Sequence, residues 1–569
     1  MTTTQSANMA GTTSWSNSLV ALIFVGTLVQ AFWMWFFSFY DIDVVNQTAA
    51  AQSLLDGYGL SVSVFNPIAL VAERVPLSHF PFGYSVLVAS LLQFGLNYWW
   101  ANYIPALLGT VCFLVCWLLI ASRLGLSPGA RLSIAAYWAL LYNPLQLCAP
   151  CDIVTVAVFS VGILFCLQAI RSHRQRAWAA SIAGICLGMC VCFRYAYAVA
   201  AVVPIFVLLV THLRFHKPAM GVIAVAALGT GVVTMLVPLY LKVISASIDY
   251  VPSGHSVLNF STLHWENLPR MAPFPAQFLG LTELTQVVSA KLSRPVWAIG
   301  AQGLLWLASL PAPVLLVEQV RKYWFVSKSS PGGKSGDVDE PAGSEKLGGS
   351  LKLQQDSKPM HAFFYLTGLM LLVLIPSMTS YFSLLHPMEI QGGKPWTFVM
   401  TNRYYTLICG FLMLCLAQAV FPVAGRSSLV LTKKWVTAFV VVVALMAGIF
   451  QLRWMAWAVT GHFVPDGLNG PSSDDAKLIL RVIREHIVAK ENVLYFDDNE
   501  VRRGFATMAG AAAEATSVLK KSPGVKLKPT IILLTVPTSS SLSAGGGSVL
   551  EHLTGPPLAQ NARIAIYRM

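Results

Sequence analysis

Charged residues are scarce in this sequence. Only 11% of the 569 residues are Asp, Glu, Lys or Arg, whereas 56% are hydrophobic and the mean hydropathy is +0.63. A soluble domain carries about 25% charged residues, so this composition excludes a soluble globular protein. The sequence predicts an all-α polytopic membrane protein.

Acidic residues are the rarer of the two signs, with 25 Asp and Glu against 38 Lys and Arg and a net charge of +13. In a soluble domain this excess would indicate a nucleic-acid partner. Here most basic residues fall in short loops between apolar runs, which is the positive-inside bias of membrane proteins. The charge therefore indicates orientation, and we expect no nucleic-acid partner.

Cysteine and histidine at metal-ligand spacing are missing as well. Most of the 10 cysteines lie inside apolar runs, where they act as small hydrophobic residues. Cys148 and Cys151 flank a loop and would form a disulfide if that loop faces an oxidising compartment. No His or further Cys accompanies them, so a Cys/His metal site is not expected.

Long hydrophobic runs are what the sequence has in abundance. Eleven runs are credible membrane spans, near residues 19–39, 101–122, 131–147, 153–170, 177–193, 195–212, 218–242, 296–317, 361–383, 404–422 and 435–459. No small-residue cleavage site follows the first run, which indicates a retained signal-anchor. With residues 1–18 in the cytoplasm, eleven crossings place all five basic loops there too and make residues 19–460 the transmembrane domain.

Two stretches do not fit simple crossings. Residues 82–96 offer about 15 residues where roughly 20 are needed, so whether this helix crosses the membrane or lies along its surface stays open. The run from Ala177 to His212 would measure about 54 Å at 1.5 Å per residue, too long for one span. We expect two helices that meet on the outer side at Arg194, the charge at the midpoint of this run.

Two segments differ in composition from the spans. Residues 327–358 are rich in Gly and Ser and charged, which is typical of a disordered cytoplasmic linker. Residues 461–569 contain a helical pattern at 473–488 and short strand patterns at 492–496, 530–536 and 563–567. We therefore expect a small extracytoplasmic α/β domain at the C-terminus.

The first apolar run ends in an aromatic cluster, as membrane helices do at the headgroups, and Asp41 and Asp43 follow it at once. These acids open the first outer loop, residues 40–100, in which we expect surface helices. They are either a polar stop or N-cap for a helix from Val44 to Leu55, or part of a site. Ionisable residues at membrane depth are costly and usually face a cavity or a partner.

Further along, Asp152 begins a span, Arg194 lies at the helix break, and Arg403 precedes the tenth span. A cavity lined by acids and arginines at the outer leaflet suits a substrate with a phosphate headgroup and a lipid tail. Snorkelling to the interface is the alternative role for each arginine.

The first loop carries three short motifs in a fixed order: Asp41-xxx-Val45-xxx-Ala49, then Ser53-Leu54-Leu55-Asp56-Gly57-Tyr58-Gly59, then Phe80-Pro81-Phe82-Gly83-Tyr84. This order resembles the first-loop pattern of the bacterial type-C (GT-C) integral membrane glycosyltransferases. Relatives in that superfamily include the aminoarabinose transferases and the protein O-mannosyltransferases. Val45 and Phe80 depart from the pattern, which often has Tyr and a second Pro at these positions.

The resemblance continues at Cys151-Asp152-Ile153, at Phe193-Arg194-Tyr195 and at Asn402-Arg403-Tyr404-Tyr405, and covers most of the membrane part. It implies a glycosyltransferase of the bacterial inner membrane and cell envelope that takes a sugar from a polyprenyl-phosphate donor to an acceptor hydroxyl. The acceptor, whether lipid, glycan or protein, stays open, and so does the sugar.

The chemistry assigns roles to these residues. The departing phosphate needs counter-charge, which Arg194 and Arg403 would supply as paired donors, with Tyr404 and His79 near the phosphate or sugar. The acceptor hydroxyl needs a base, and Asp41 occupies the position that matches the acid of the family. Asp152 would be the second catalytic acid.

A cofactor is not expected, because a lipid monophosphate donor lacks the diphosphate that makes a metal necessary. If a divalent ion is needed, for example with a lipid pyrophosphate donor, Asp41, Asp43 and Asp152 are the candidate ligands.

Three rival functions remain. A polysaccharide polymerase or ligase of another membrane fold would rely on Arg and His in a late outer loop and would not need Asp41. A lipid or solute transporter would bury acids within its spans, whereas Asp152 and Glu318 lie at span edges. A non-catalytic assembly subunit is the third.

Overall fold

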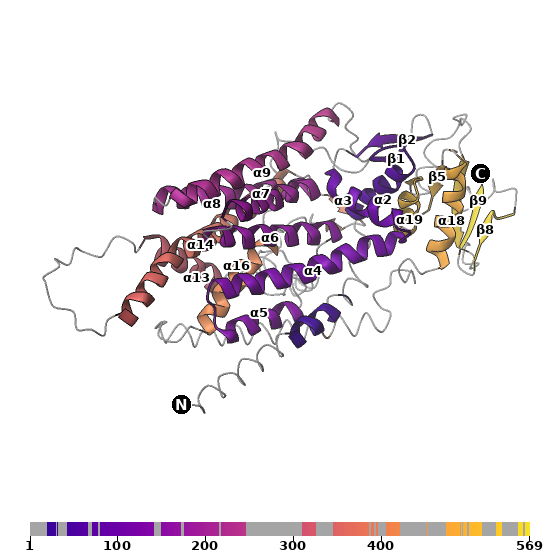
Figure 1. The fold of residues 1–569 in the computed structure, drawn as a ribbon. Coiled ribbons are helices and arrows are strands. Elements are labelled where there is room, and N and C mark those ends of the chain that lie inside the picture. Colours follow the sequence, from indigo (N-terminus) through magenta and orange to yellow (C-terminus); the bar gives the residue numbers. More distant parts are fainter. Residues whose placement is uncertain are drawn as a thin grey trace, which may run out of the picture.

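The computed structural model shows an elongated bundle of helices with a small sheet at one end (Figure 1). It describes residues 20–29, 31, 42–66, 71–77, 80–140, 149–171, 176–215, 218–245, 310–325, 345–385, 389–391, 394–396, 406–421, 452, 474–489, 491, 493–497, 500–514, 531–537, 556–561 and 564–568. The first-loop elements and the C-terminal sheet lie at one end of the bundle, and α13 and α14 are seen towards the other (Figure 1).

Within the described residues, five helices are long and apolar enough to cross a membrane. They are α4 (Tyr98–Arg123), α6 (Pro150–Arg171), α7 (Arg176–Phe193), the segment Tyr195–Phe215 that contains α8 (Ala198–Phe215), and the part Lys358–Met378 of α14 (Glu345–Leu385). Apolar helices of this length make the chain an integral membrane protein.

The predicted count of eleven spans is not confirmed by these five helices. α5 (Pro128–Leu140) and α16 (Thr406–Val420) overlap predicted spans, and their described parts measure about 20 Å and 22 Å at 1.5 Å per residue. α13 (Pro311–Val320) covers part of another, and α9 (Pro218–Ser245) covers the seventh. The predicted span at 435–459 lies almost wholly outside the described residues.

The helix break at Arg194 is confirmed. α7 ends at Phe193, Arg194 itself has extended backbone with φ −158° and ψ 114°, and the short 3-10 turn η2 (Tyr195–Tyr197) leads into α8. A charged side chain at this point is thereby held at a helix end rather than in the middle of a long span.

The first loop folds into two helices and a hairpin. α2 (Ile42–Leu55) matches the helix predicted from Val44, and β1 (Ser61–Asn66) pairs antiparallel with β2 (Val71–Pro76), a hairpin that the sequence analysis did not foresee. Gly57 and Gly59, with φ of 82° and 73°, make the turn from α2 into the hairpin. α3 (Phe82–Gln93) is about 18 Å long, which is short for a crossing.

The C-terminal part forms a five-stranded sheet in the order β6-β5-β7-β9-β8. Its elements are α18 (Asp474–Val488), β5 (Val493–Phe496), α19 (Glu500–Met508), β6 (Ala512–Glu514), β7 (Ile531–Pro537), β8 (Ala559–Gln560) and β9 (Ile564–Arg568). β5 runs parallel to β6 and β7, whereas β9 is antiparallel to β7 and β8. The helix and the three strands predicted here coincide with α18, β5, β7 and β9.

The C-terminal elements pack on the first loop through a shared core. Val45 of α2 and Trp99 of α4 are buried in one cluster with Ile479 of α18 and Phe505 of α19. The C-terminal sheet therefore lies at the same end of the bundle as the beginnings of α2 and α4, as Figure 1 shows.

The predicted linker, residues 327–358, is helical in its second half. Residues 345–358 belong to α14, which begins at Glu345. The Lys, Leu and Gln residues of this stretch are good helix formers, and they outweigh the local Gly pair once the following span extends the helix.

Candidate functional site

Three charged side chains from three separate segments meet in one place. Nη2 of Arg194 lies 2.5 Å from Oδ2 of Asp43, and its Nε lies 3.1 Å from Oδ1 of Asp152. Asp43 belongs to the first turn of α2, Asp152 to the first turn of α6, and Arg194 to the break after α7. We call these residues the Arg194 triad.

The triad is buried, with 8%, 0% and 5% of the surfaces of Asp43, Asp152 and Arg194 exposed. The helix ends match the charges, because an N-terminus favours a carboxylate and a C-terminus favours a cation. Both aspartates stand in first turns, and Arg194 follows the last residue of α7. The local fold therefore brings two acids and one base to helix ends that suit them.

The motif Phe80-Pro81-Phe82-Gly83-Tyr84 forms one wall of the triad. The ring of Phe80 lies with its centroid 5.7 Å from Cζ of Arg194. Gly83 packs so closely on the end of α7 that a Cβ there would stand 2.6 Å from the carbonyl oxygen of Cys192. Only glycine permits this approach, which sets α3 directly beside Arg194.

A buried polar network, absent from the sequence predictions, lies beside the triad. The hydroxyl of Tyr84 donates to Oδ1 of Asn102 (2.8 Å), and Nδ2 of Asn102 donates to Oγ1 of Thr48 (3.0 Å) and to the carbonyl oxygen of Tyr98 (2.7 Å). Tyr84, Asn102 and Thr48 are 0% exposed. The network ties α2 to α3 and α4 and so fixes the helix that carries Asp43.

Burial of this kind is costly. Removing one partner of a buried ion pair typically costs about 3–5 kcal/mol, whereas replacing the whole pair by apolar groups is often neutral or stabilising. A buried triad with two carboxylates and one guanidinium is thus a poor way to gain stability. Such clusters at membrane depth are functional-site candidates.

The structure brings together only part of the predicted site. Arg194 and Asp152 meet, while Asp41, His79, Arg403 and Tyr404 lie outside the described residues. Arg403 and Tyr404 precede α16 in the sequence. Oγ of Ser127, in the turn between α4 and α5, donates to the carbonyl oxygen of Phe421, the residue after α16. The end of α16 therefore lies at the end of the bundle opposite the triad, and its beginning is directed towards the triad end.

Asp43 as a partner of Arg194 was missed, because the sequence suggested it only as a polar stop, an N-cap or a metal ligand. The available signal was the spacing Asp41-x-Asp43, which places the second acid inside the first turn of the following helix. Among the described residues no three His, Cys, Asp or Glu side chains come together as a metal-ligand set. Between Asp43 and Asp152 the guanidinium of Arg194 occupies the cationic position.

A second charged contact, the Asp56–Arg484 clasp, joins the first loop to the C-terminal helix α18. Nη1 and Nη2 of Arg484 donate to the two carboxylate oxygens of Asp56 at 2.7 and 2.8 Å. Burial acts to raise the pKa of Asp56, but the hydrogen bonds and charge of Arg484 outweigh it, and the net effect is a lowered pKa. Gln52 also donates to Asp56, and Arg74 stacks over the ring of Tyr58.

Comparisons with known proteins give structural likeness at low sequence identity. No family model and no curated protein matches the chain. The chain is similar to ArnT from Cupriavidus metallidurans bound to undecaprenyl phosphate (11% identity, 96% of this chain and 97% of that one, TM-score 0.39). It is also similar to the apo oligosaccharyltransferase of Archaeoglobus fulgidus (10% identity, 92% and 69%, TM-score 0.47). Both are GT-C glycosyltransferases. At TM-scores below 0.5 these likenesses assign no role to any residue here.

Proposed function

We propose that this protein is a membrane glycosyltransferase that moves a sugar from a polyprenyl-phosphate donor to an acceptor hydroxyl on the extracytoplasmic face. The observation that carries the proposal is the Arg194 triad, in which a guanidinium is held between two carboxylates at the end of a helix bundle. One of the first-loop motifs that resemble the GT-C pattern packs against this triad, since Phe80 lies over Arg194 and Gly83 packs on the end of α7.

The donor supplies a leaving group that needs charge stabilisation. A phosphate carries about −1.5 to −2 charge at neutral pH, so its departure calls for positioned cations rather than for a strong acid. Arg194 is fixed by Asp43 and Asp152 and thus pre-organised to stabilise charge that develops as the glycosidic bond breaks. Arg403 and Tyr404 are proposed to complete the phosphate site, with His79 near the sugar.

The acceptor hydroxyl must lose a proton as it attacks. Asp43 and Asp152 contact Arg194, which gives them the role of holding the cation. Asp41 stands two residues before Asp43, immediately before α2, and is the proposed base. Asp152 then serves the reaction by orienting Arg194, and no divalent ion enters the proposed step.

The proposed location follows from the charge bias of the loops. The triad end, with the C-terminal sheet packed on it, would face the outside of a bacterial inner membrane, where lipid-linked sugars and envelope acceptors meet. A mass-spectrometric comparison of the cell envelope with and without the gene would identify the sugar and the acceptor.

The test is the substitution Asp41→Asn in the full-length protein, reconstituted with a polyprenyl-phosphate sugar. Loss of the base is expected to slow transfer by about 10² to 10⁴-fold, with the thermal unfolding temperature unchanged. Glu73→Gln in β2, an exposed acid of the same loop, is the matched control and should keep full activity. Full activity in Asp41→Asn would overturn the assignment of the base.

A further inference from the structure

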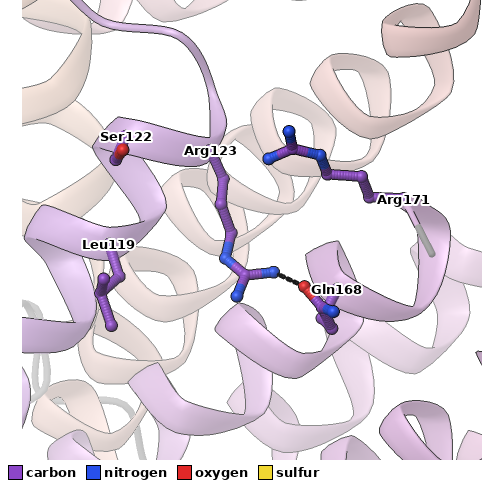
Figure 2. A pocket seen from close by; sticks show the side chains of 5 residues that line it. All are labelled: Leu119, Ser122, Arg123, Gln168 and Arg171. Atoms are coloured by element: carbon purple, nitrogen blue, oxygen red, sulfur yellow. Dashed lines mark hydrogen bonds between the residues drawn. The ribbon is translucent and has the colours of Figure 1, made fainter. Parts of the chain in front are cut away.

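A second meeting point of arginines lies at the other end of the bundle. Leu119, Ser122, Arg123, Gln168 and Arg171 line a pocket of about 410 Å³ (Figure 2). Ser122 and Arg123 end α4, and Gln168 and Arg171 end α6. The pocket is therefore built from the closing turns of two of the five long apolar helices.

The position of the pocket relative to the triad fits the thickness of a bilayer. Both are on α6, because Asp152 stands in its first turn and Arg171 in its last. From Asp152 to Arg171 the helix rises about 28 Å at 1.5 Å per residue, close to the hydrocarbon thickness of about 30 Å. With the triad at one headgroup level, the pocket lies at the headgroup level of the opposite leaflet.

The pocket concentrates positive charge. Among the described residues that line it, two are arginines and none is acidic. Arg123 donates a hydrogen bond from Nη1 to Oε1 of Gln168, which aims its guanidinium into the pocket, and the side chain of Arg171 extends over the same space (Figure 2). Two cations held close together favour an anion between them, and paired guanidinium donors suit the oxygens of a phosphate.

The rim of the pocket is apolar on one side. Leu119 is 44% exposed and continues a line of exposed residues on α4 formed by Leu108 (63%) and Val115 (36%). Residues at this spacing share one helix face, and an exposed apolar face on a membrane helix contacts acyl chains. A ligand at this place meets guanidinium groups on one side and lipid tails on the other.

We propose that this pocket binds the phosphate of an anionic lipid headgroup in the leaflet opposite the triad. The chemistry recognised is a phosphate oxyanion, so a soluble phosphate could engage the same guanidiniums. The apolar rim at Leu119 favours the lipid. Ordinary snorkelling would send each arginine separately to water, whereas here Gln168 directs Arg123 into a space that it shares with Arg171.

The test measures lipid binding to the full-length protein by native mass spectrometry in detergent. Phosphatidylglycerol is titrated against phosphatidylcholine, and inorganic phosphate is added in a separate arm. The double variant R123Q/R171Q is expected to bind phosphatidylglycerol about tenfold or more weakly than the wild type, because it loses the charge-assisted hydrogen bonds of both guanidiniums to the phosphate. Phosphatidylcholine binding should not change.

A matched control removes the same charge from the same end of the bundle. Arg131 stands in the second turn of α5, just after the short turn from α4, and Arg214 stands in the last turn of α8, where it donates to the carbonyl oxygen of Trp324. Neither lines the pocket. The variant R131Q/R214Q is expected to bind phosphatidylglycerol as the wild type does. If both double variants lose phosphatidylglycerol affinity equally, the lipid is attracted by diffuse surface charge, and the assignment of the pocket as the binding site is wrong.

Two further outcomes complete the test. Arg171 is exposed, so R171Q alone should leave the fold intact and still weaken phosphatidylglycerol binding several-fold, which guards against a misfolded double variant. Inorganic phosphate at millimolar concentration should not displace the lipid. If it binds with an arginine-dependent affinity while phosphatidylglycerol and phosphatidylcholine bind equally, the pocket is a soluble-phosphate site and the lipid assignment is wrong.

Discussion

Two arginine–aspartate contacts join distant segments of this chain, and they are built differently. In the Asp56–Arg484 clasp the guanidinium contacts a single carboxylate among the described residues, and the side chains are 16% and 26% exposed. In the Arg194 triad the guanidinium lies between two carboxylates, and the side chains of Arg194, Asp43 and Asp152 are 6%, 12% and 0% exposed. Among the described residues, the clasp pairs one cation with one carboxylate near water, whereas the triad gathers two carboxylates around one guanidinium in a buried place.

The difference indicates what each contact is for. A paired, partly exposed contact holds two surfaces together at small cost. A buried cluster of charged side chains is not needed for holding helices together, because apolar side chains would do that as well or better. We therefore assign the clasp to docking of the C-terminal helix α18 and the triad to chemistry, and five predictions test that division.

The largest effect is expected from Arg194→Gln. This change leaves the carboxylates of Asp43 and Asp152 buried around a neutral amide, so we expect at least a 100-fold loss of sugar transfer together with a lower unfolding temperature. Transfer in reconstituted vesicles and thermal unfolding measure the two effects. Unchanged sugar transfer by a folded Arg194→Gln protein would show that the triad has no role in the reaction.

A smaller but still large effect is expected from Gly83→Ala. The new Cβ would stand 2.6 Å from the carbonyl oxygen of Cys192, so α3 must move away from Arg194. Displacement of a catalytic group by about 1 Å can cost about 100-fold in rate, and we expect a loss of that order. Gly229→Ala, where a Cβ meets nothing within 4 Å, is the matched control and should retain activity.

The sequence alone predicted the helices better than the site. Apolar runs and the charge at Arg194 were sufficient to place α4, α6, α7, α8 and the break between the last two, because their length and composition are dictated by the bilayer. The β1/β2 hairpin was missed although the sequence carries signals for it: Ser and Val alternate in β1, and the pair Asn66-Pro67 favours a turn directly after it.

The partners of the charges were harder to predict than their positions. Asp152 and Arg194 were expected to share a pocket, but the choice of Asp43 as the other contact depends on how α2 is oriented against the bundle. That orientation is set by long-range contacts: Thr48 with Asn102, and Val45 with the C-terminal cluster. Neither contact leaves a local pattern in the sequence.

In the clasp, Arg484→Gln is expected to have a modest effect. It removes two charge-assisted hydrogen bonds to Asp56, and because the side chains are partly exposed we expect a loss of about 1 kcal/mol in docking of α18. Faster proteolysis of the C-terminal part should report this loss, while sugar transfer changes less than threefold. Abolished transfer would mean that the clasp, too, serves the chemistry.

The smallest effect is expected when the pH is lowered below the pKa of Asp56 in the folded protein. The pKa of Asp56 is lower in the folded protein than its usual 3.8, so its contribution to stability is present above about pH 4 and is lost as the pH falls through the folded value. The wild type should approach the proteolysis rate of Asp56→Asn below pH 4 and differ from it above. Equal rates at neutral pH would contradict a stabilising clasp.

The most direct test of the division compares two substitutions that keep the charge, Arg194→Lys and Arg484→Lys. Lysine cannot present the planar fork that reaches two carboxylates, so sugar transfer by Arg194→Lys is expected to fall about 30-fold or more while its fold is retained. Arg484→Lys should transfer sugar within about threefold of the wild type. Equal rates for the two variants, or full activity of Arg194→Lys, would contradict the assignment of the triad as the catalytic centre.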